Sequence, residues 1–481
     1  MSNQTVAKIL EFGEKKPKLE QSNAAVVRQD RYQLKDLRAF VNIDSVRYEL
    51  INFSAFGFAI SSQERMPGGL EIKGCKIMIE DFILQEIDAK KVREEELVTE
   101  GYCIAFEITS APLSVEKLHL FPEIWRIIQQ VELERQKISK VPAVFTARVF
   151  ELKNLLQKLE QKIEALSASK TFLSRADLEE FQDTAITVTG RAIYQVWQGF
   201  HSELSLMLEN QAEDVTKEAF VFFREQMKGL LYQSPFAQRC LTKPRGYAGD
   251  YEMMNLIYKQ QDMGETLFGK CVERAFLDHA EPQAVRNRIE FLHEQILNLL
   301  HKHPVGRLRI MSVASGPAAE IQKLMEVLNQ EDLDRLEVVL LDQDESSLKH
   351  AQRQVRQIGR KLGKKFDVTL FHQSIKLIIS NGLEVDAFDL IYSAGLFDYF
   401  SDAVAHMAGK VLFNSVKKGG RLIIGNFDIS TPNRFGMSLV FDWNLIYRSR
   451  ADLERIFGFP GAAIQVQHEK NGINLFCVLT K

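Results

Sequence analysis

Residues 308–342 constrain the fold of this chain most, because they follow the pattern of a βαβ unit. Residues 308–313 form a short apolar run that predicts a buried strand, and small residues follow at once in the turn 314–319. A helical period comes next, and a second apolar run ends in Asp342. Small residues at such a turn let a ligand approach the backbone, and the acid can accept hydrogen bonds from ribose hydroxyls. The unit therefore suits an adenosine-containing ligand, while an ordinary βαβ repeat with a tight turn remains the alternative.

Composition narrows the class of protein. A chain of 481 residues is too long for one typical core, so we expect two or three domains. Its apolar fraction of 45% and charged fraction of 26% are ordinary for a soluble protein. A formal net charge of -3 gives no broad electrostatic reason to bind nucleic acid. The cysteines show no metal-binding spacing, and the sequence has no signal peptide or long apolar run. We expect a cytoplasmic protein without a metal site or a transmembrane segment.

The N-terminal part predicts a small antiparallel β-barrel. Residues 1–25 are polar and aperiodic, which indicates a loose tail, and residues 26–120 contain short β-rich runs separated by turn residues. Within this part, Asn52, Ser54 and Gly57 form the pattern NxSxxG, and Arg28 and Arg31 lie upstream. It resembles the PilZ domain, whose [DN]xSxxG and RxxxR motifs bind cyclic di-GMP, although Arg28 stands one residue from the position that RxxxR requires. The resemblance implies a cyclic di-GMP site; the alternative is a barrel that only docks another domain.

Residues 121–281 change to helical periodicity. Apolar residues in this region step alternately by four and three, which is a heptad pattern. They are Phe145, Val149, Leu152, Leu156, Leu159, Ile163 and Leu166. The pattern fits either a coiled-coil homodimer formed through residues 145–166 or a helix packed inside its own bundle, and the sequence leaves both open.

The segment 242–255, TKPRGYAGDYEMMN, predicts a structured loop near the end of the helical region. Proline and glycine interrupt the helices on either side, and glycine lets the backbone come close to a ligand. Arg245, Tyr247 and Tyr251 provide polar groups in this loop. We expect the loop to cover a binding site, while a turn held only by its own side chains is the alternative.

Beyond Asp342 the alternation of strands and helices continues and ends in a hairpin, because Asn471-Gly472 joins two alternating runs. This order resembles the class I S-adenosylmethionine-dependent methyltransferases over residues 282–481. The resemblance implies a seven-stranded, Rossmann-like α/β sheet with an antiparallel last strand, and S-adenosylmethionine as the cofactor. A nicotinamide oxidoreductase would continue with parallel strands and is therefore the weaker alternative.

The resemblance also implies roles for particular residues. Those expected to contact the cofactor are Ala314, Ser315, Gly316 and Ala318 in the methionine-side turn, Asp342 on the ribose, Gln373 and Ser374 beside adenine, and Ser393 at the start of the substrate mouth. The family often has an acid where Ser312 stands and glycine at positions 314 and 318. We therefore expect Glu320 to take over the contact with the methionine ammonium group.

The loop 242–255 is similar to a segment of the extracellular-factor 3-hydroxypalmitic acid methyl ester biosynthesis methyltransferases. This resemblance implies methyl transfer to a fatty-acid carboxylate or a similar small acid. A carboxylate acceptor needs no general base, whereas a hydroxyl or amine needs one. The candidate bases are Tyr247, Tyr251, His372, Asp398 and Tyr399.

Three arginines are candidates for holding a carboxylate of either the acceptor or the cofactor, because a guanidinium binds carboxylates as a bidentate fork. They are Arg245, Arg286 and Arg288, of which Arg245 in the loop is preferred. The competing hypothesis for the whole chain is a cyclic di-GMP-responsive signalling or scaffold protein whose methyltransferase domain has lost its chemistry.

Overall fold

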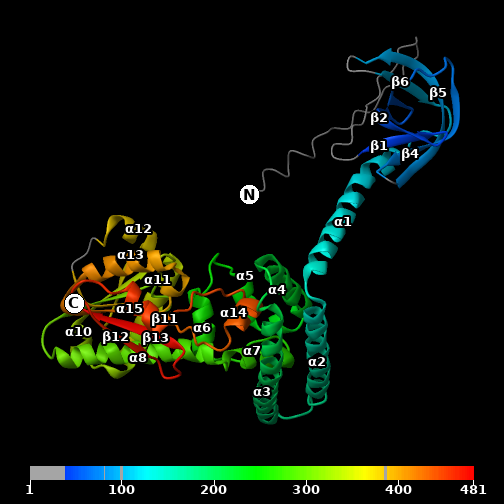
Figure 1. Cartoon of the computed structure of the whole chain (residues 1–481). Coiled ribbons are helices and arrows are strands. Elements are labelled where there is room, and N and C mark those ends of the chain that lie inside the picture. Colours follow the sequence, from blue (N-terminus) through cyan, green and yellow to red (C-terminus); the bar gives the residue numbers. More distant parts are fainter. Residues whose placement is uncertain (1–37, 81, 98–100, 384–386) are drawn as a thin grey trace, which may run out of the picture. The chain divides into compact units, whose positions relative to one another are not determined.

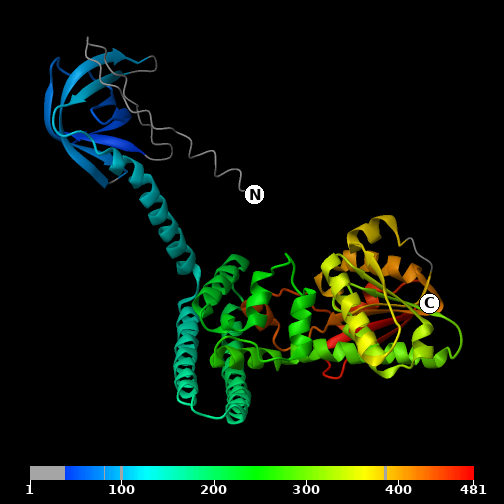
Figure 2. The ribbon, with the colours of Figure 1, turned by 180° about the vertical axis from the view of Figure 1, so that it is seen from behind.

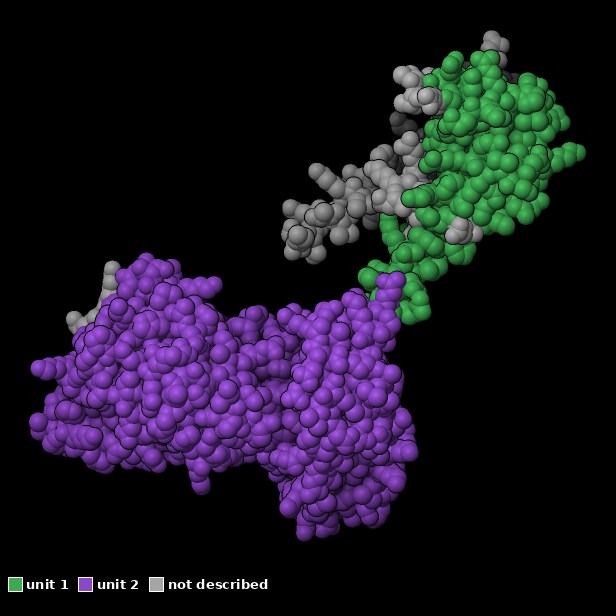
Figure 3. Space-filling model, in the orientation of Figure 1, with its two compact units in different colours: residues 1–135 green, residues 136–481 purple. Residues whose placement is uncertain are grey.

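A computed structural model of the chain describes residues 38–80, 82–97, 101–383 and 387–481. The chain divides into two compact units, residues 1–135 and residues 136–481 (Figure 3). Within the described parts of the chain, no helix combines the length and the apolar character needed to cross a membrane.

The first unit contains a closed antiparallel barrel with the strand order β1-β2-β3-β6-β5-β4 (Figure 1), which confirms the predicted barrel. The strands are β1 (Ala39–Ile43), β2 (Val46–Ser54), β3 (Gly57–Ser62), β4 (Glu71–Ile79), β5 (Phe82–Glu96) and β6 (Tyr102–Ile108). Alternate residues point inward, as Val41 and Ile43 of β1 do. The helix α1 (Val115–Lys140) follows the barrel and runs across the boundary between the two units.

The second unit begins with a helical part. Its helices are α2 (Ala143–Ala168), α3 (Arg175–Leu208), α4 (Glu213–Met227), η1 (Leu231–Gln233), α5 (Pro235–Thr242), α6 (Tyr251–Lys259), α7 (Leu267–Leu277) and α8 (Ala280–Lys302). Local sequence determines several of their ends. Ser174 caps α3 by accepting from the Asp177 amide, and Asp250 caps α6 by accepting from the amides of Glu252 and Met253.

The heptad pattern of α2 is used inside this chain. Phe145, Val149, Leu152 and Leu156 are buried in one core together with residues of α3, α4 and α7. This packing takes the face that the predicted homodimer through residues 145–166 would need. The bundle alternative describes the structure, because a buried helix face has the same apolar spacing whether its partner is in the same chain or in another.

The C-terminal part is a seven-stranded sheet with the order β12-β13-β11-β10-β7-β8-β9. Its strands are β7 (Leu308–Val313), β8 (Leu336–Asp342), β9 (Thr369–His372), β10 (Phe388–Ser393), β11 (Val416–Phe427), β12 (Ala463–His468) and β13 (Asn474–Thr480). The neighbours from β9 to β11 pair in parallel, and β13 is antiparallel to both β11 and β12. The predicted mixed sheet with its terminal hairpin is confirmed.

Helices cover both faces of this sheet (Figures 1 and 2). The helices that follow its first strand are α9 (Ala319–Val327), α10 (Gln330–Asp334), α11 (Glu345–Leu362), α12 (Ile375–Asn381), η2 (Phe397–Tyr399), α13 (Asp402–Asn414), α14 (Arg434–Phe441) and α15 (Arg450–Ile456). Successive residues of a strand face opposite sides. Ile310 therefore packs in the core with α8, α9 and α11, whereas Met311 packs in the core with α12, α13 and α15.

The strand order predicts where a ligand binds. From β7 the chain proceeds to β8 on one side, whereas β10 and β11 lie on the other side. Such a reversal opens a crevice at the carboxyl ends of the central strands, where open α/β sheets bind their ligands. The long helix α8 joins the two parts of the unit, because it packs against α6 and α7 and also against α9 and β13 (Figure 2).

Candidate active site

A cavity of about 840 Å³ lies at the carboxyl ends of β7, β8 and β10. It is lined by the turn after β7, by Asp342 at the end of β8, by Ala394, Gly395 and Leu396 after β10, and by part of the loop between α5 and α6. Small-molecule sites typically have volumes of roughly 300–1,000 Å³, so this cavity has the size of a cofactor site.

The turn after β7 has an unusual backbone. Ala314, Gly316 and Ala318 have φ values of 53°, 53° and 51°, in the left-handed region. Glycine adopts this region freely, whereas a residue with a Cβ does so at a cost of about 1–2 kcal/mol. The chain thus keeps at positions 314 and 318 a conformation that suits glycine, although alanine stands there. Ala314, Ser315 and Gly316 line the cavity, and Ala318 is buried directly before α9.

Asp342 ends β8 and faces this turn. Its side chain lines the cavity, and the residue is 7% exposed. Oδ2 accepts a hydrogen bond from the Gly316 amide at 3.0 Å, and Oδ1 accepts one from the Asp344 amide at 2.9 Å. Burial raises the pKa of this carboxyl. Ser347 Oγ also donates to Oδ2 at 3.5 Å. A carboxylate has about four lone-pair positions, so these three donors leave it able to accept from a ligand hydroxyl.

Glu320 reaches the cavity from the first turn of α9. Its Oε1 accepts hydrogen bonds from the Tyr392 hydroxyl at 2.7 Å and from Ser312 Oγ at 3.4 Å. Burial raises the pKa of this carboxyl as well. Ser312, where the resemblance led us to expect an acid, thus contacts an acid that comes from the neighbouring helix.

Gln373 and Ser374 follow β9 and line the cavity beside Asp342. The Gln373 amide donates to the main-chain oxygen of Asp342 at 3.1 Å, and Ser374 caps α12. His372 precedes them but lies outside the cavity. Its ring is exposed and contacts the main-chain oxygen of Gln343 at 3.0 Å.

Residues 243–249, here called the strap, pass over the cavity, and five of them line it. Lys243 Nζ pairs with Asp442 Oδ2 at 2.5 Å. On the other side, Asp344 Oδ2 accepts from the Tyr247 hydroxyl at 3.2 Å and from Arg245 Nη1 at 3.1 Å. The strap is therefore fastened both to the residue after α14 and to the loop after β8.

Arg245, the preferred candidate for a carboxylate, lies outside the cavity. Its Nη2 donates to the Tyr251 hydroxyl and to Glu252 Oε1, both at 2.8 Å, and its guanidinium stacks over the Tyr251 ring at 4.5 Å. The pKa of the Arg245 guanidinium is raised, and the hydrogen bond to Glu252 is the largest cause. These contacts and the pair with Asp344 assign Arg245 to holding the strap in place.

Arg286 and Ser393 also lie outside the cavity. The Arg286 guanidinium donates to the main-chain oxygen of Leu277 at 2.9 Å and to Gln283 Oε1 at 2.8 Å, so its donors serve the helical part. Ser393 is fully buried within β10, and the residues directly after it reach the cavity instead. The structure thus does not bring these two residues together with the others predicted to bind the cofactor.

The three tyrosines predicted to be catalytic, Tyr247, Tyr251 and Tyr399, all line the cavity. Burial is the main cause that raises the pKa of each hydroxyl above its ordinary value. They therefore stay protonated near neutral pH, so that they can donate hydrogen bonds but do not suit the role of a general base. The Tyr399 hydroxyl accepts from Trp443 Nε1 at 2.6 Å.

Asp398 is the candidate base with a suitable environment. It is buried, lines the cavity, and accepts the Phe427 amide on Oδ1 at 2.7 Å. Burial raises the pKa of this carboxyl to about 6. A carboxyl with such a pKa is mostly ionised at pH 7 and yet basic enough to take a proton in a reaction.

Sequence reasoning missed one wall of the cavity. The helix α14 ends at Phe441, because Asp442 adopts a left-handed φ of 49°. Asp442, Trp443, Asn444 and Leu445 then line the cavity as irregular chain. The sequence carries no glycine or proline at position 442 that could have signalled this end.

The PilZ-like residues belong to the first unit. Asn52 lies beside an irregularity in the pairing of β2 with β3. Ser54 Oγ donates to the Gly57 main-chain oxygen at 3.3 Å and accepts from the Phe56 amide at 3.4 Å. A Cβ at Gly57 would lie 2.8 Å from the Phe106 main-chain oxygen, so glycine lets β3 approach β6 closely. Arg28 and Arg31 lie outside the described residues, so the binding of cyclic di-GMP stays a prediction.

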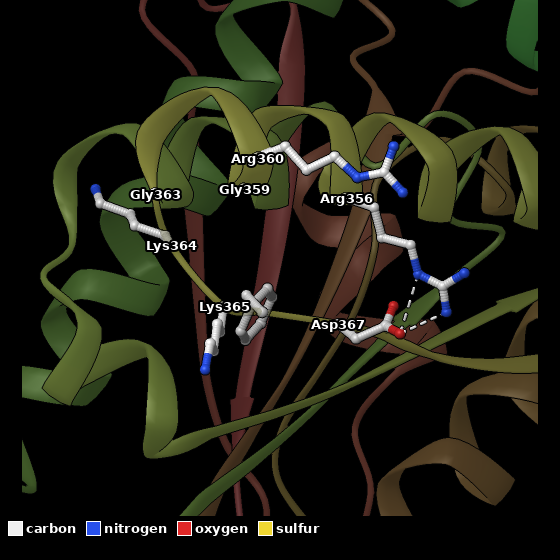
Figure 4. A pocket seen from close by; sticks show the side chains of 8 residues that line it. Arg356, Gly359, Arg360, Gly363, Lys364, Lys365 and Asp367 are labelled. Atoms are coloured by element: carbon white, nitrogen blue, oxygen red, sulfur yellow. Dashed lines mark hydrogen bonds and ion pairs between the residues drawn. The ribbon is translucent and has the colours of Figure 1, made fainter.

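A second hollow of about 660 Å³ lies at the end of α11, lined by basic residues (Figure 4). Arg356 pairs there with Asp367 at 2.6 Å, and Arg360, Lys364 and Lys365 lie nearby. Because α11 starts at the carboxyl end of β8, its own end lies toward the opposite edge of the sheet. This hollow is therefore separate from the crevice where α/β sheets bind ligands.

No protein-family model matches the chain, and no curated protein matches it. Solved structures do resemble it. A possible exported protein from Bordetella parapertussis has 16% sequence identity and a TM-score of 0.39, and the match covers 62% of this chain and 96% of that one. Magnesium protoporphyrin IX methyltransferase from Synechocystis, solved with bound SAH, has 14% identity and a TM-score of 0.32, covering 42% of this chain and 88% of that one.

The N-methyltransferase NodS from Bradyrhizobium japonicum, in complex with S-adenosyl-l-homocysteine, has 13% identity and a TM-score of 0.29, covering 42% of this chain and 92% of that one. Similarity at this level does not establish a family. The chain's own geometry has to carry the assignment of a function.

Proposed function

We propose that the second unit is an S-adenosylmethionine-dependent methyltransferase that acts on a small acid or lipid-like acceptor. The observation that supports this most is the cavity at the strand reversal, into which the buried carboxylate of Asp342 faces beside the left-handed turn after β7. This combination suits an adenosine-containing ligand, because the turn admits the ligand close to the backbone and the acid accepts from ribose hydroxyls.

The other polar groups of the cavity fit the same cofactor. Glu320 offers a buried carboxylate to the methionine ammonium group, and Gln373 and Ser374 lie beside Asp342 where the adenine would extend. Acidic side chains in a cavity of low dielectric also favour a ligand with positive charge. S-adenosylmethionine brings both a cationic sulfonium centre and an electrophilic methyl group.

The chain contributes alignment and exclusion of water to the transfer. The walls of the cavity hold the acceptor in line with the methyl group, and the strap shields that geometry from solvent. The three cavity tyrosines stay protonated, which favours an acceptor that is already ionised. A carboxylate is such an acceptor, and the resemblance of the strap region suggests a 3-hydroxy fatty acid, whose methylation gives a methyl ester.

The acceptor can be found by mass spectrometry. The purified chain is incubated with methyl-labelled S-adenosylmethionine and either 3-hydroxyhexadecanoic acid or extracts of lipids and small acids. We expect label in an ester of an acid, and little label with the Asp342→Ala variant. Label on an amine or hydroxyl instead would correct the acceptor class and make Asp398 the base to test. Absence of transfer to every fraction by a protein that binds the cofactor would contradict the proposed activity.

The barrel supports a second, separate role as a reader of cyclic di-GMP. The turn that carries the NxSxxG pattern lies at the barrel surface, and Phe56 within it is 51% exposed. Calorimetric titration of the full chain with cyclic di-GMP tests this role, and saturable binding at micromolar ligand is the expected result. A flat titration at high micromolar ligand would remove it without touching the methyltransferase assignment.

A further inference from the structure

Arg288 differs from the other arginines near the cavity. It lies on α8, lines the cavity, and is 6% exposed. Arg245 has carboxylate partners and Arg286 donates to main-chain oxygens, and neither lines the cavity. Among the described residues, Arg288 forms no ion pair, because no carboxylate oxygen approaches its guanidinium within 4.0 Å.

Only some of the N–H donors of the Arg288 guanidinium form hydrogen bonds. Nη1 donates to the main-chain oxygen of Ala394 at 3.1 Å. The charge of the group also opposes the burial that raises the pKa of the nearby Tyr258 hydroxyl. Nε is buried without a hydrogen-bond partner in the described part of the chain. A Cβ at Gly395 would lie 2.6 Å from Nη1, so glycine at this position makes room for the guanidinium against the backbone.

The other cations that line the cavity are in a different situation. Lys243 pairs with Asp442 at 2.5 Å, and Lys376 is exposed on α12. Asp398 of the same cavity interacts with the charge of Arg288, but beyond the 4.0 Å of an ion pair. Burial of a charge that lacks a direct ion-pair partner is costly, and a ligand that supplies the opposite charge at short range removes this cost. The planar fork of a guanidinium matches the two oxygens of a carboxylate. The buried, incompletely satisfied Arg288 is thus the group in the cavity that best suits a ligand carboxylate.

We propose that Arg288 is the carboxylate receptor of this cavity. The proposal rests on the proposed methyltransferase function, which provides two sources of the same chemistry. One is the amino-acid head of the cofactor, whose ammonium group is assigned to Glu320. The other is the acid acceptor.

The test compares two ligands of the full chain by calorimetry. S-adenosylhomocysteine carries the amino-acid head, whereas 5′-methylthioadenosine keeps the adenosine and thioether but lacks the head. If Arg288 holds the cofactor carboxylate, Arg288→Met weakens the affinity for S-adenosylhomocysteine at least about tenfold and leaves that for methylthioadenosine unchanged, since hydrogen bonds to charged groups contribute about 1.5–3 kcal/mol. Arg288→Lys, which keeps the charge but loses the fork, should be intermediate.

If Arg288 holds the acceptor, the affinity for both nucleoside ligands is unchanged, and the KM for the acid acceptor rises about tenfold or more in Arg288→Met. Either pattern supports the proposal. Unchanged binding together with an unchanged KM would overturn it. An equal loss for both ligands would also overturn it, because Arg288 would then support the fold.

Two controls separate this result from other failures. Arg356→Met replaces an arginine of the exposed hollow at the end of α11, and it should change neither affinity. A wild-type chain that binds neither nucleoside ligand would contradict the proposed function itself, and this outcome is visible before any variant is measured.

Discussion

The carboxyl groups of Asp342, Glu320 and Asp398 line the same cavity, and all three residues are buried. Burial is the first cause that raises the pKa of each, because a charged carboxylate loses its hydration there. Hydrogen-bond donors of the protein oppose this effect, such as the Phe427 amide on Asp398. Ionising these buried carboxyls therefore destabilises the ligand-free protein, and a cationic ligand would reduce this effect.

Asp398→Asn tests this cost in the protein without ligand. The folded protein holds the Asp398 proton up to about pH 6, above the ordinary pKa of 3.8, so the contribution of this group to stability is complete below pH 3.8 and is lost as the pH rises to 6. A shift of about two units corresponds to about 3 kcal/mol. The asparagine keeps an acceptor for the Phe427 amide but has no charge to bury.

Urea unfolding from pH 4 to pH 8 measures the difference. We expect the variant and the wild type to have similar unfolding free energies at pH 4, and the variant to be more stable by up to about 3 kcal/mol at pH 8. Parallel pH profiles for the two proteins would show that Asp398 is not the group described here.

Some of the candidate site residues could be placed from the sequence, because their positions depend on local structure. Asp342 ends β8, and Gly316, Gln373 and Ser374 lie within three residues of the ends of β7 and β9, so recognising the strands in the sequence also places these residues at the crevice. Whether they bind a cofactor stays a prediction.

The sequence could not show which of the two arginines of α8 reaches the cavity. Arg286 and Arg288 are two residues apart and therefore point about 200° apart around the helix, so which of them reaches the cavity depends on which face of α8 packs toward the sheet. Long-range packing of α8 against both parts of the unit decides that Arg288 reaches the cavity. Trp443 was missed for a similar reason, since a left-handed Asp442 ends α14 without a local signal.

At the scale of elements, the strap is the segment whose attachments matter most for the cavity. It is tied through Lys243 to Asp442 and through Arg245 and Tyr247 to Asp344. Asp344 also caps α11, but with its other oxygen, Oδ1. One attachment can therefore be weakened without loss of the helix cap, because an asparagine side chain still accepts from the helix amides.

Asp344→Asn and Lys243→Met should each make a bound nucleoside leave faster. Partly exposed ion pairs contribute about 0.2–1 kcal/mol, so we expect the dissociation rate of S-adenosylhomocysteine to rise roughly two- to fivefold in each variant and further in the double variant. Stopped-flow displacement measures these rates. Dissociation from the double variant at the wild-type rate would mean that the strap does not retain the ligand.

The helix α2 shows a limit of sequence reasoning at the same scale. Its heptad spacing identified a buried helix face correctly, but the spacing cannot tell an internal partner from a second chain. The partners turned out to be α3, α4 and α7, which are far from one another in sequence and join one core only after folding.

At the scale of the whole molecule, the cavity belongs to one of the two units. Its lining residues lie between positions 243 and 445, and the second unit covers residues 136–481. A chain shortened to residues 136–481 should therefore bind S-adenosylhomocysteine with an affinity within about twofold of the full chain, because independent sites contribute additively to within about 0.3–0.5 kcal/mol.

Calorimetry on the shortened and full chains checks this expectation, with circular dichroism to verify that the helices remain. A shortened chain that is folded but binds at least about tenfold more weakly would show that the barrel unit contributes to the site, since such a loss exceeds additive error.

The central claim is that the cavity beside Asp342 binds an adenosine cofactor. The most direct measurement is calorimetric titration of the full chain with S-adenosylhomocysteine, using Asp342→Ala as the variant and Asp367→Ala, an exposed partner of Arg356, as its control. We predict saturable binding to the wild type and the control, and a loss of at least about tenfold in Asp342→Ala, because hydrogen bonds to a charged group contribute about 1.5–3 kcal/mol. A folded wild type that does not bind, or an Asp342→Ala variant that binds as tightly as the wild type, would contradict the claim.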